Sequence, residues 1–187
     1  MAVRVGCILL ASGFSRRFGG DKLLSLLDGD PLYSRAFAAL PARLFEKAVV
    51  TSRFPEILDS ARGAGYDALE NLRADEGVAA GIRLGMEHMA GMDGVLFAVC
   101  DQPWLTCGSA ERLLAEFCCH PHSIAALSWE GRRGNPVIFS ADLFPELCLL
   151  TGDRGGSAVI KRHPDRLRMV EAGNARELHD VDAPDDL

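Results

Sequence analysis

Three features that the sequence lacks exclude whole classes of protein. Its longest apolar runs, such as Val95 to Cys100, are far shorter than the roughly 20 residues that a helix needs to cross a bilayer. Acidic residues outnumber basic ones by 26 to 20, and the net charge of −6 argues against a general nucleic-acid surface, which must neutralise phosphates with lysine and arginine. We therefore expect no membrane span and no nucleic-acid partner.

Cysteine pairs at redox or zinc spacing are also missing. The six cysteines form no CxxC pair, and four of them fall in runs that predict a buried strand or helix, which suggests reduced thiols. The first apolar stretch is too short for the hydrophobic region of a secretory signal, and glycine and arginine follow it instead of a cleavage site. These features predict a cytoplasmic protein without a disulfide framework.

The size and composition of the chain are typical of a globular protein. Its 187 residues fit one hydrophobic core, since single cores usually stop growing only beyond about 250 residues. Apolar residues make up 48% and charged residues 25%, close to the average for globular domains. We expect residues 1–187 to form a single domain.

In the first half of the chain, short apolar runs alternate with segments whose apolar residues recur at helical spacing. The alternation predicts an α/β protein, a Rossmann-like three-layer α/β/α sandwich with a mostly parallel sheet. Ligands of such sheets bind beyond the carboxyl ends of the strands, here Ala11, Thr51 and Cys100. The expected strands are Arg4 to Ala11, Phe45 to Thr51 and Gly94 to Val99, and the expected helices are Pro31 to Leu40, Pro55 to Arg62 and Ala79 to Met89.

The second half continues the same rhythm and adds a hairpin. Two apolar runs flank the glycine turn Glu130 to Gly134, which is typical of a β-hairpin. The acidic tail from Asp180 suggests a solvated terminus. The expected strands are Ile124 to Trp129, Pro136 to Phe139 and Leu167 to Glu171, and the expected helices are Ser109 to Cys118, Ala141 to Leu149 and Ser157 to Arg162.

A glycine-rich, basic segment follows the first predicted strand. It reads Leu10-Ala-Ser-Gly-Phe-Ser-Arg-Arg-Phe-Gly-Gly-Asp-Lys22, and it matches neither the Walker loop nor the dinucleotide fingerprint. Gly13 permits a sharp turn that points N–H groups inward, while Arg17 and Lys22 can neutralise the oxygens of a triphosphate. The pattern favours a polyphosphate site, and the alternative is a flexible surface turn with solvated cations.

One carboxylate, Asp101, ends the strongly apolar run Gly94 to Val99 and is followed by Gln-Pro. Magnesium prefers one or two carboxylates together with substrate phosphates, so a single aspartate facing a triphosphate loop suffices for a Mg²⁺ site. The alternative is that Asp101 only caps the following turn.

These segments resemble a known family over nearly the whole chain. The glycine-rich loop is similar to the signature LAAGxSxRMGxxK of the MobA-like nucleotidyltransferases, which attach nucleotides to molybdopterin, and more loosely to that of sugar-phosphate nucleotidyltransferases. Asp101-Gln-Pro resembles the family's metal-binding segment, and residues 71–85 resemble its N…GxxxSxxxG stretch. Three residues depart from the family's pattern. Ser12 stands where the family has Ala or Gly, Phe18 replaces Met, and Gly81 replaces Ser. The resemblance implies catalytic roles for Arg17, Lys22 and Asp101, with Mg²⁺ on Asp101, and nucleotide-binding roles for Leu10, Ala11, Ser12, Gly13, Ser15, Arg17, Lys22, Asn71 and Gly77.

Two later segments resemble the subfamily that makes the cytosine dinucleotide form of the cofactor. They are Gly131 to Phe139, similar to GxxGxPVLF, and Gly152-Asp-Arg-Gly-Gly156, similar to a GDxG loop. The resemblance implies that Arg132, Arg133, Asn135 and Asp153 face the acceptor. Exposed hairpin arginines are otherwise commonplace. The ending Asp180-Val-Asp182-Ala-Pro is similar to the family's "DIDTPEDL", which suggests a structural cap.

The activity that the resemblance implies is transfer of CMP from CTP to molybdopterin with release of pyrophosphate. The alternatives are guanylyl transfer from GTP to the same acceptor and nucleotidyl transfer to a sugar or alcohol phosphate. A different class of function is a carrier that binds the cofactor and delivers it to a molybdenum hydroxylase without catalysis.

Overall fold

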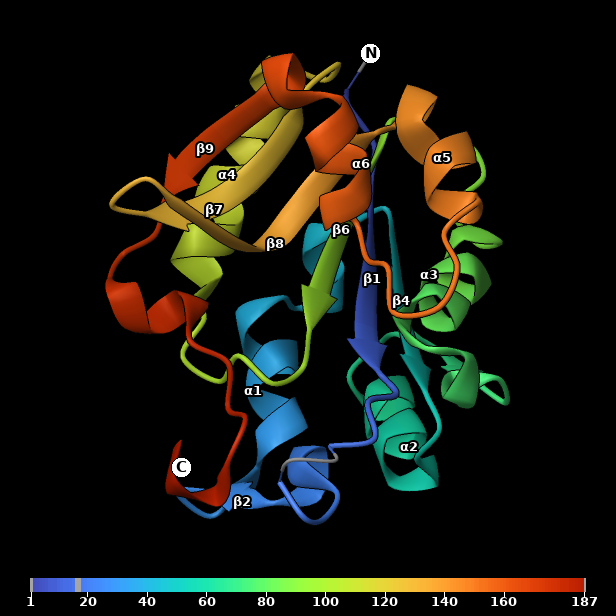
Figure 1. Cartoon of the computed structure of the whole chain (residues 1–187), viewed down its shortest axis with the longest axis vertical. Helices are drawn as coiled ribbons and strands as arrows, with labels where there is room; N and C mark the ends of the chain where they lie inside the picture. The colour runs from blue at the N-terminus through green and yellow to red at the C-terminus, as the bar shows by residue number, and fades with distance from the viewer. Residues whose placement is uncertain (1, 16–17, 187) are drawn as a thin grey trace.

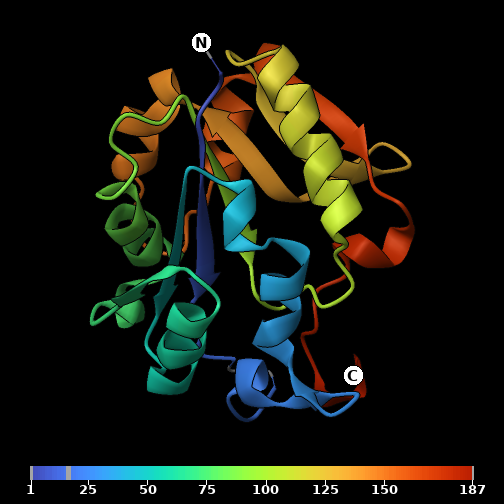
Figure 2. The ribbon, with the colours of Figure 1, turned by 180° about the vertical axis from the view of Figure 1, so that it is seen from behind.

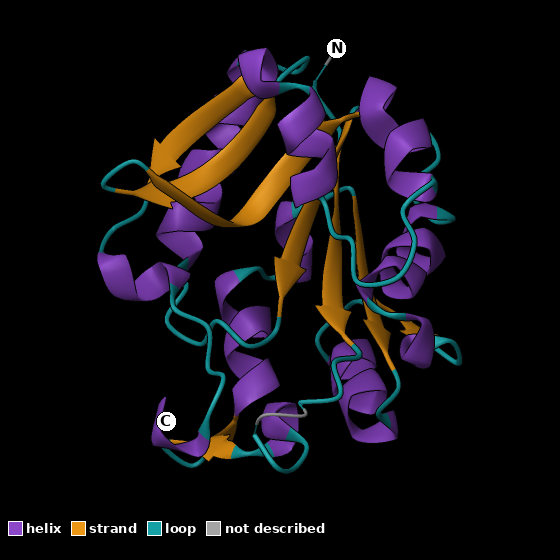
Figure 3. Cartoon of the chain, in the orientation of Figure 1, coloured by secondary structure: helices purple, strands orange, loops and turns teal. Residues whose placement is uncertain are grey.

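A single seven-stranded sheet forms the centre of the molecule. The computed structural model describes residues 2–15 and 18–186. The order of the strands is β5-β4-β1-β6-β8-β7-β9, and β2 and β3 form a separate small hairpin. Figures 1 and 3 show the sheet with helices packed on it. The strands are β1 (Val5–Ala11), β2 (Leu26–Leu27), β3 (Asp30–Pro31), β4 (Lys47–Ser52), β5 (Asp67–Glu70), β6 (Gly94–Val99), β7 (Ile124–Trp129), β8 (Arg132–Ser140) and β9 (Leu167–Glu171).

The sheet is parallel except at one strand. β1 pairs in parallel with β4 and β6, β4 with β5, and β7 with β9. Only β8, among the described strands of this sheet, runs against both its neighbours, β6 and β7. β1 is an inner strand and is buried along almost its whole length, which explains its continuous run of apolar residues.

Helices cover both faces of the sheet. Figure 2 shows α1, α2 and α4 on one face, and Figure 1 shows α3, α5 and α6 on the other. Two separate apolar cores result, one containing Leu9, Val50 and Phe117 and the other Ile8, Val49 and Phe139, because successive side chains of a strand point to opposite faces. The predicted three-layer α/β/α sandwich is therefore confirmed. The helices are α1 (Leu32–Ala39), α2 (Pro55–Gly63), α3 (Val78–Met86), α4 (Cys107–Cys119), α5 (Phe144–Cys148) and α6 (Ser157–Arg162).

The structure differs from the predicted elements mainly where tertiary contacts override local pattern. The predicted hairpin turn is shorter, because Glu130 and Gly131 alone adopt positive φ and β8 already begins at Arg132. The predicted helix Ala141 to Leu149 is broken into a 3-10 turn and the short α5, with Pro145 in the first turn of α5. β5 and the β2–β3 hairpin were not predicted, since two- to four-residue strands carry little periodic signal.

The carboxyl ends of β1, β4 and β6 meet at one edge of the sheet, and the amino end of β8 joins them because that strand is reversed. The C-terminal segment runs past this edge to lie near the β2–β3 hairpin in both views (Figures 1 and 2). No helix within residues 2–15 and 18–186 has the length and apolarity needed to cross a membrane.

Candidate active site

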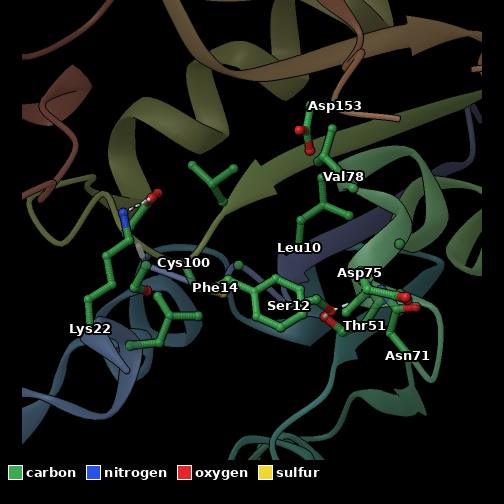
Figure 4. A pocket seen from close by; sticks show the side chains of 18 residues that line it. Leu10, Ser12, Phe14, Lys22, Thr51, Asn71, Asp75, Val78, Cys100 and Asp153 are labelled. Carbon is green, nitrogen blue, oxygen red and sulfur yellow. Dashed lines mark hydrogen bonds and ion pairs between the residues drawn. The ribbon is translucent and has the colours of Figure 1, made fainter. Parts of the chain in front are cut away.

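A cavity of about 340 Å³ lies at this edge of the sheet. The glycine-rich loop after β1 forms one wall, and the start of α3 forms another. Phe14 lies between Lys22 and Ser12 in Figure 4. Among the predicted nucleotide-binding residues that the structure describes, only Ala11 does not line the cavity, because it is fully buried in the core. The lining residues predicted from sequence are Leu10, Ser12, Gly13, Ser15, Lys22, Asn71, Gly77, Asp101 and Asp153.

Lys22 and Asp101 meet at one end of the cavity. The Lys22 Nζ lies 2.7 Å from Asp101 Oδ2, although the two residues are 79 positions apart in the sequence. Their side chains are 11% and 21% exposed. An ion pair that is largely removed from water is screened little by solvent, so the two charges set the local field of this part of the cavity.

The C-terminal segment completes the surroundings of Lys22. The Lys22 Nζ also donates to the Val181 carbonyl at 2.8 Å and lies 3.7 Å from Asp182 Oδ1. Val181 is fully buried, and its N–H donates to the Asp101 carbonyl at 2.9 Å. The expectation of a solvated acidic tail holds only for exposed side chains such as that of Asp185, because the backbone at Val181 binds the two charged residues of the cavity.

Gln102 fastens the C-terminal segment to the loop that carries Asp101. Its buried side-chain amide donates to Asp180 Oδ1 at 2.7 Å. Partial removal from water and, second, the negative charge of Asp101 raise the pKa of Asp180, while the bond from Gln102 opposes the rise. The hydrogen bond from the Gln102 amide therefore favours the charged form of Asp180, although the carboxylate of Asp101 lies nearby.

Asp101 has one oxygen that fits a cation. Its Oδ1 is buried and has no hydrogen-bond partner among the described residues, whereas Oδ2 is bound to Lys22. A buried carboxylate oxygen without a partner is costly unless a ligand supplies one. The described residues contain no group of three histidine, cysteine or carboxylate side chains suited to hold a metal. The unpaired Asp101 Oδ1 is an available oxygen ligand of the kind that Mg²⁺ prefers.

At the other end of the cavity, polar side chains link three elements. The Ser12 Oγ donates to the Thr51 carbonyl at 3.2 Å and accepts from Asn71 Nδ2 at 3.1 Å. Both interactions are internal, so the Ser12 hydroxyl serves chiefly to hold the loop. The buried Thr51 Oγ1 has no hydrogen-bond partner among the described residues, and a Cβ on Gly81 would lie 3.0 Å from it.

Gly77 brings two walls of the cavity together. Its φ is +92°, and a Cβ there would lie 2.5 Å from both the Gly152 backbone and Asp153 Oδ1, so only glycine fits. The N–H groups of Gly77 and Ala79 already donate to the carbonyls of Ala74 and Gly152. These N–H groups are therefore bound within the protein, and Gly77 allows residues 151–156 to pack closely against the start of α3.

A second cavity of about 210 Å³ adjoins the first and shares Leu10, Val78, Val99 and Asp153 with it. Arg133, Asn135 and Asp153, all predicted to face the acceptor, line it. The Arg133 Nη2 donates to Ser157 Oγ at 2.9 Å, which places its guanidinium at the rim. Arg132 lines neither cavity and is exposed at the start of β8.

The arrangement suits charge neutralisation better than covalent catalysis. Cys100 lines the larger cavity, but its burial and, second, the nearby Asp101 raise the pKa of its thiol far above the ordinary value. A thiol that stays protonated is a poor nucleophile. The cavity instead offers the Lys22 ammonium, the half-satisfied carboxylate of Asp101 and the backbone of the glycine-rich loop as groups that can bind charge.

Some of the site lies outside the predictions. Arg17, predicted to be catalytic, falls outside the described residues. Thr51, Gln102 and Val181 were not predicted. The position of Thr51 at a strand end that the sequence did identify was a usable signal, because ligands of such sheets bind at strand ends. Val181 contributes through its backbone carbonyl, which no side-chain pattern indicates.

Comparisons with known proteins show the family and the fold of the chain. The purine catabolism protein PucB of Bacillus subtilis is 31% identical over 96% of this chain and 92% of its own length. A molybdenum cofactor guanylyltransferase of Mesorhizobium japonicum is 31% identical over 96% of this chain and 91% of its own. The crystal structure of Rv0371c from Mycobacterium tuberculosis shares the fold, with a TM-score of 0.80 and 23% identity over 100% of this chain and 96% of the other. The model of the MobA-like NTP transferase domain matches residues 7–167, and the chain therefore belongs to that family.

Proposed function

We propose that the protein transfers CMP from CTP to the terminal phosphate of molybdopterin, with Mg²⁺ as cofactor and pyrophosphate as the second product. The observation that carries the proposal is the Lys22–Asp101 pair, 2.7 Å apart beside the glycine-rich loop. A cation and a carboxylate with a free oxygen at one end of a cavity suit a triphosphate and its metal ion. The adjoining smaller cavity gives the acceptor a place within reach.

The reaction needs little covalent work from the protein. An oxygen of the acceptor phosphate attacks the α-phosphorus of CTP, a new P–O bond forms, and the bond to the β-phosphate oxygen breaks to release pyrophosphate. The acceptor oxygen is already anionic, so no general base is required. Catalysis of this kind rests on positioning and on neutralising charge.

The residues divide this work between the two cavities. The loop backbone at Gly13 and Ser15 would contact the triphosphate, and Lys22 would balance charge on the departing pyrophosphate. Mg²⁺ bound to Asp101 would supply further neutralisation of the phosphates. Arg133, Asn135 and Asp153 would orient the acceptor from the smaller cavity.

The choice of cytosine rests on sequence. The loop Leu10-Ala-Ser-Gly lacks the double glycine of the guanylyl-transferring pattern, and Gly131 to Phe139 resembles the cytidylyl-transferring subfamily. The Mesorhizobium relative is named a guanylyltransferase. Its name supports the molybdenum cofactor as acceptor and makes GTP the second candidate donor.

The test compares CTP, GTP and ATP with molybdopterin and Mg²⁺, using release of pyrophosphate and the mass of the product as readouts. CTP should give the highest kcat/KM, and Asp101→Ala should abolish the reaction. Release from GTP alone would replace the cytidylyl assignment by a guanylyl one. No release with any donor would overturn the transferase and leave the carrier function, in which the protein binds the cofactor and delivers it to a molybdenum hydroxylase.

A further inference from the structure

Arg53 lies directly after β4, in the short connection to α2. Its side chain is 28% exposed and contacts three side chains among the described residues. The guanidinium lies over the ring of the neighbouring Phe54, with 3.9 Å between Cζ and the ring centroid, and over the ring of Phe14 at 4.6 Å. The Nη2 donates to Asp21 Oδ1 at 2.5 Å.

Two of these contacts reach opposite ends of the glycine-rich loop. Phe14 follows Gly13 at the start of the loop, and Asp21 directly precedes Lys22 at its end. One side chain from a different strand therefore holds both ends. Because Asp21 also precedes the 3-10 turn that begins at Lys22, fixing Asp21 fixes the backbone from which the Lys22 side chain extends.

The contacts suit arginine specifically. A planar guanidinium can stack on aromatic rings with its faces while its edge donates to a carboxylate, and an ammonium group cannot do both.

Arg53 is placed to act on the loop and not on a substrate. It is absent from the residues that line either cavity. Its Nε is buried and has no hydrogen-bond partner among the described residues, so a phosphate cannot reach that donor without movement of the side chain.

We propose that Arg53 is a positioning residue that clamps the two ends of the glycine-rich loop and thereby sets the place of Lys22 for a triphosphate. The proposal rests on the loop binding the phosphates of the donor, as in the proposed function. It does not depend on which base the donor carries or on which acceptor it meets.

The test uses the whole protein and magnesium pyrophosphate as the probe, because this ligand has no base and no acceptor. The variants are Arg53→Met, Arg53→Lys, Asp21→Asn and the double variant Arg53→Met with Asp21→Asn. The matched control is Arg62→Met, since Arg62 also makes an ion pair, 2.6 Å from Asp59, but on the exposed surface of α2. Calorimetry gives the dissociation constants, and thermal unfolding shows that each variant is folded.

Arg53→Met should weaken binding of the probe about tenfold, because misplacement of a binding group by about 1 Å costs that much or more. Arg53→Lys should recover part of the loss through the ion pair. Asp21→Asn should lose less affinity for the probe than Arg53→Met does. The double variant should lose no more affinity than Arg53→Met alone, because the two side chains act through one contact. In the full reaction, the KM for the triphosphate should rise while the KM for the acceptor stays constant, a split that general loss of structure would not produce.

The outcomes separate this proposal from the proposed function. Equal binding by Arg53→Met, Arg62→Met and the wild type overturns the clamp and leaves cytidylyl transfer intact. If the enzyme uses GTP and not CTP as donor while Arg53→Met still weakens binding of the probe, the clamp stands and the cytosine assignment falls. If the wild type does not bind magnesium pyrophosphate, the loop is not a phosphate site and both proposals fall. Should Arg53→Met fail to fold, Arg53→Lys and Asp21→Asn decide the matter, and wild-type affinity in both would contradict the clamp.

Discussion

Two carboxylate–cation pairs lie at opposite ends of β6, and they differ in what is left unsatisfied. Lys22 and Asp101 meet beyond the carboxyl end of the strand, and Arg166 and Asp142 meet near its amino end, where Ser140 of β8 pairs with Gly94. Arg166 binds Asp142 through two nitrogens, at 2.7 and 2.9 Å, and Ser140 adds a third bond. Asp101 uses a single oxygen and leaves the other without a partner among the described residues.

The difference teaches where function lies in this sheet. A carboxylate whose two oxygens both have protein partners offers less to a ligand, whereas a buried carboxylate oxygen without a partner is costly until a ligand supplies one. The same type of ion pair is thus structural at one end of β6 and, by our proposal, catalytic at the other.

Asp101→Asn should have the largest effect on activity. The substitution keeps the shape of the side chain but removes the charge that would hold Mg²⁺, and loss of one such electrostatic contact typically costs roughly 100- to 1,000-fold in rate. Single-turnover rates measure this, and the temperature of unfolding should change little. A variant with the wild-type rate would remove Asp101 from the mechanism.

Lys22→Gln should have the next largest effect. It removes the cation that would face the triphosphate, and we expect kcat/KM to fall by roughly 100-fold, the scale seen when one preorganised charge contact is lost. The matched control is Lys47→Gln, because Lys47 donates to the His88 carbonyl on the exposed surface, away from the cavity lining. Equal activities of the two variants would contradict a role for Lys22.

Gln102→Leu should have a smaller effect, since Gln102 acts through the C-terminal segment that holds Lys22. Loss of a supporting hydrogen bond behind a catalytic group costs about tenfold in activity. Steady-state kinetics with varied Mg²⁺ should show the loss. If activity instead falls as far as in Lys22→Gln, the segment contacts the substrates directly.

Asp142→Asn should leave activity unchanged and affect only stability. The hydrogen bond from Arg166 holds the pKa of Asp142 well below its usual range, and the hydrogen bond from Ser140 lowers this pKa further. A carboxylate with a lowered pKa stabilises the folded state above its ordinary pKa, and this contribution is lost as the pH falls through the lowered value.

The stability difference between Asp142→Asn and the wild type should therefore be present at pH 7 and shrink toward zero in strong acid. It should not exceed about 1 kcal/mol, because the Asp142 side chain is 55% exposed. Urea unfolding between pH 7 and pH 2 measures it. A difference that is constant with pH would show that the pair's charge does not contribute.

Much of the fold follows from local pattern, and the errors have identifiable causes. The strands Gly94–Val99, Ile124–Trp129 and Leu167–Glu171 begin and end as predicted, because a compact apolar run bounded by turn residues specifies a buried strand. β8 extends further than predicted, since Arg132 and Arg133 pair with β7 although neither is apolar. Pairing with the neighbouring strand makes these residues part of β8, although their polar side chains do not predict a strand.

For the candidate site, the sequence supplied the types of residue and the fold supplied their meeting. The sequence by itself determined an alternating strand and helix pattern, a glycine-rich basic loop after the first strand and an aspartate at the end of another. Only the tertiary structure decided that the Lys22 ammonium meets Asp101, that the Val181 carbonyl binds Lys22 and that Arg53 holds both ends of the loop. The physical reason is that periodicity and motif reflect short stretches of chain, whereas these contacts join distant segments and one of them uses the backbone, whose chemistry is the same at almost every residue.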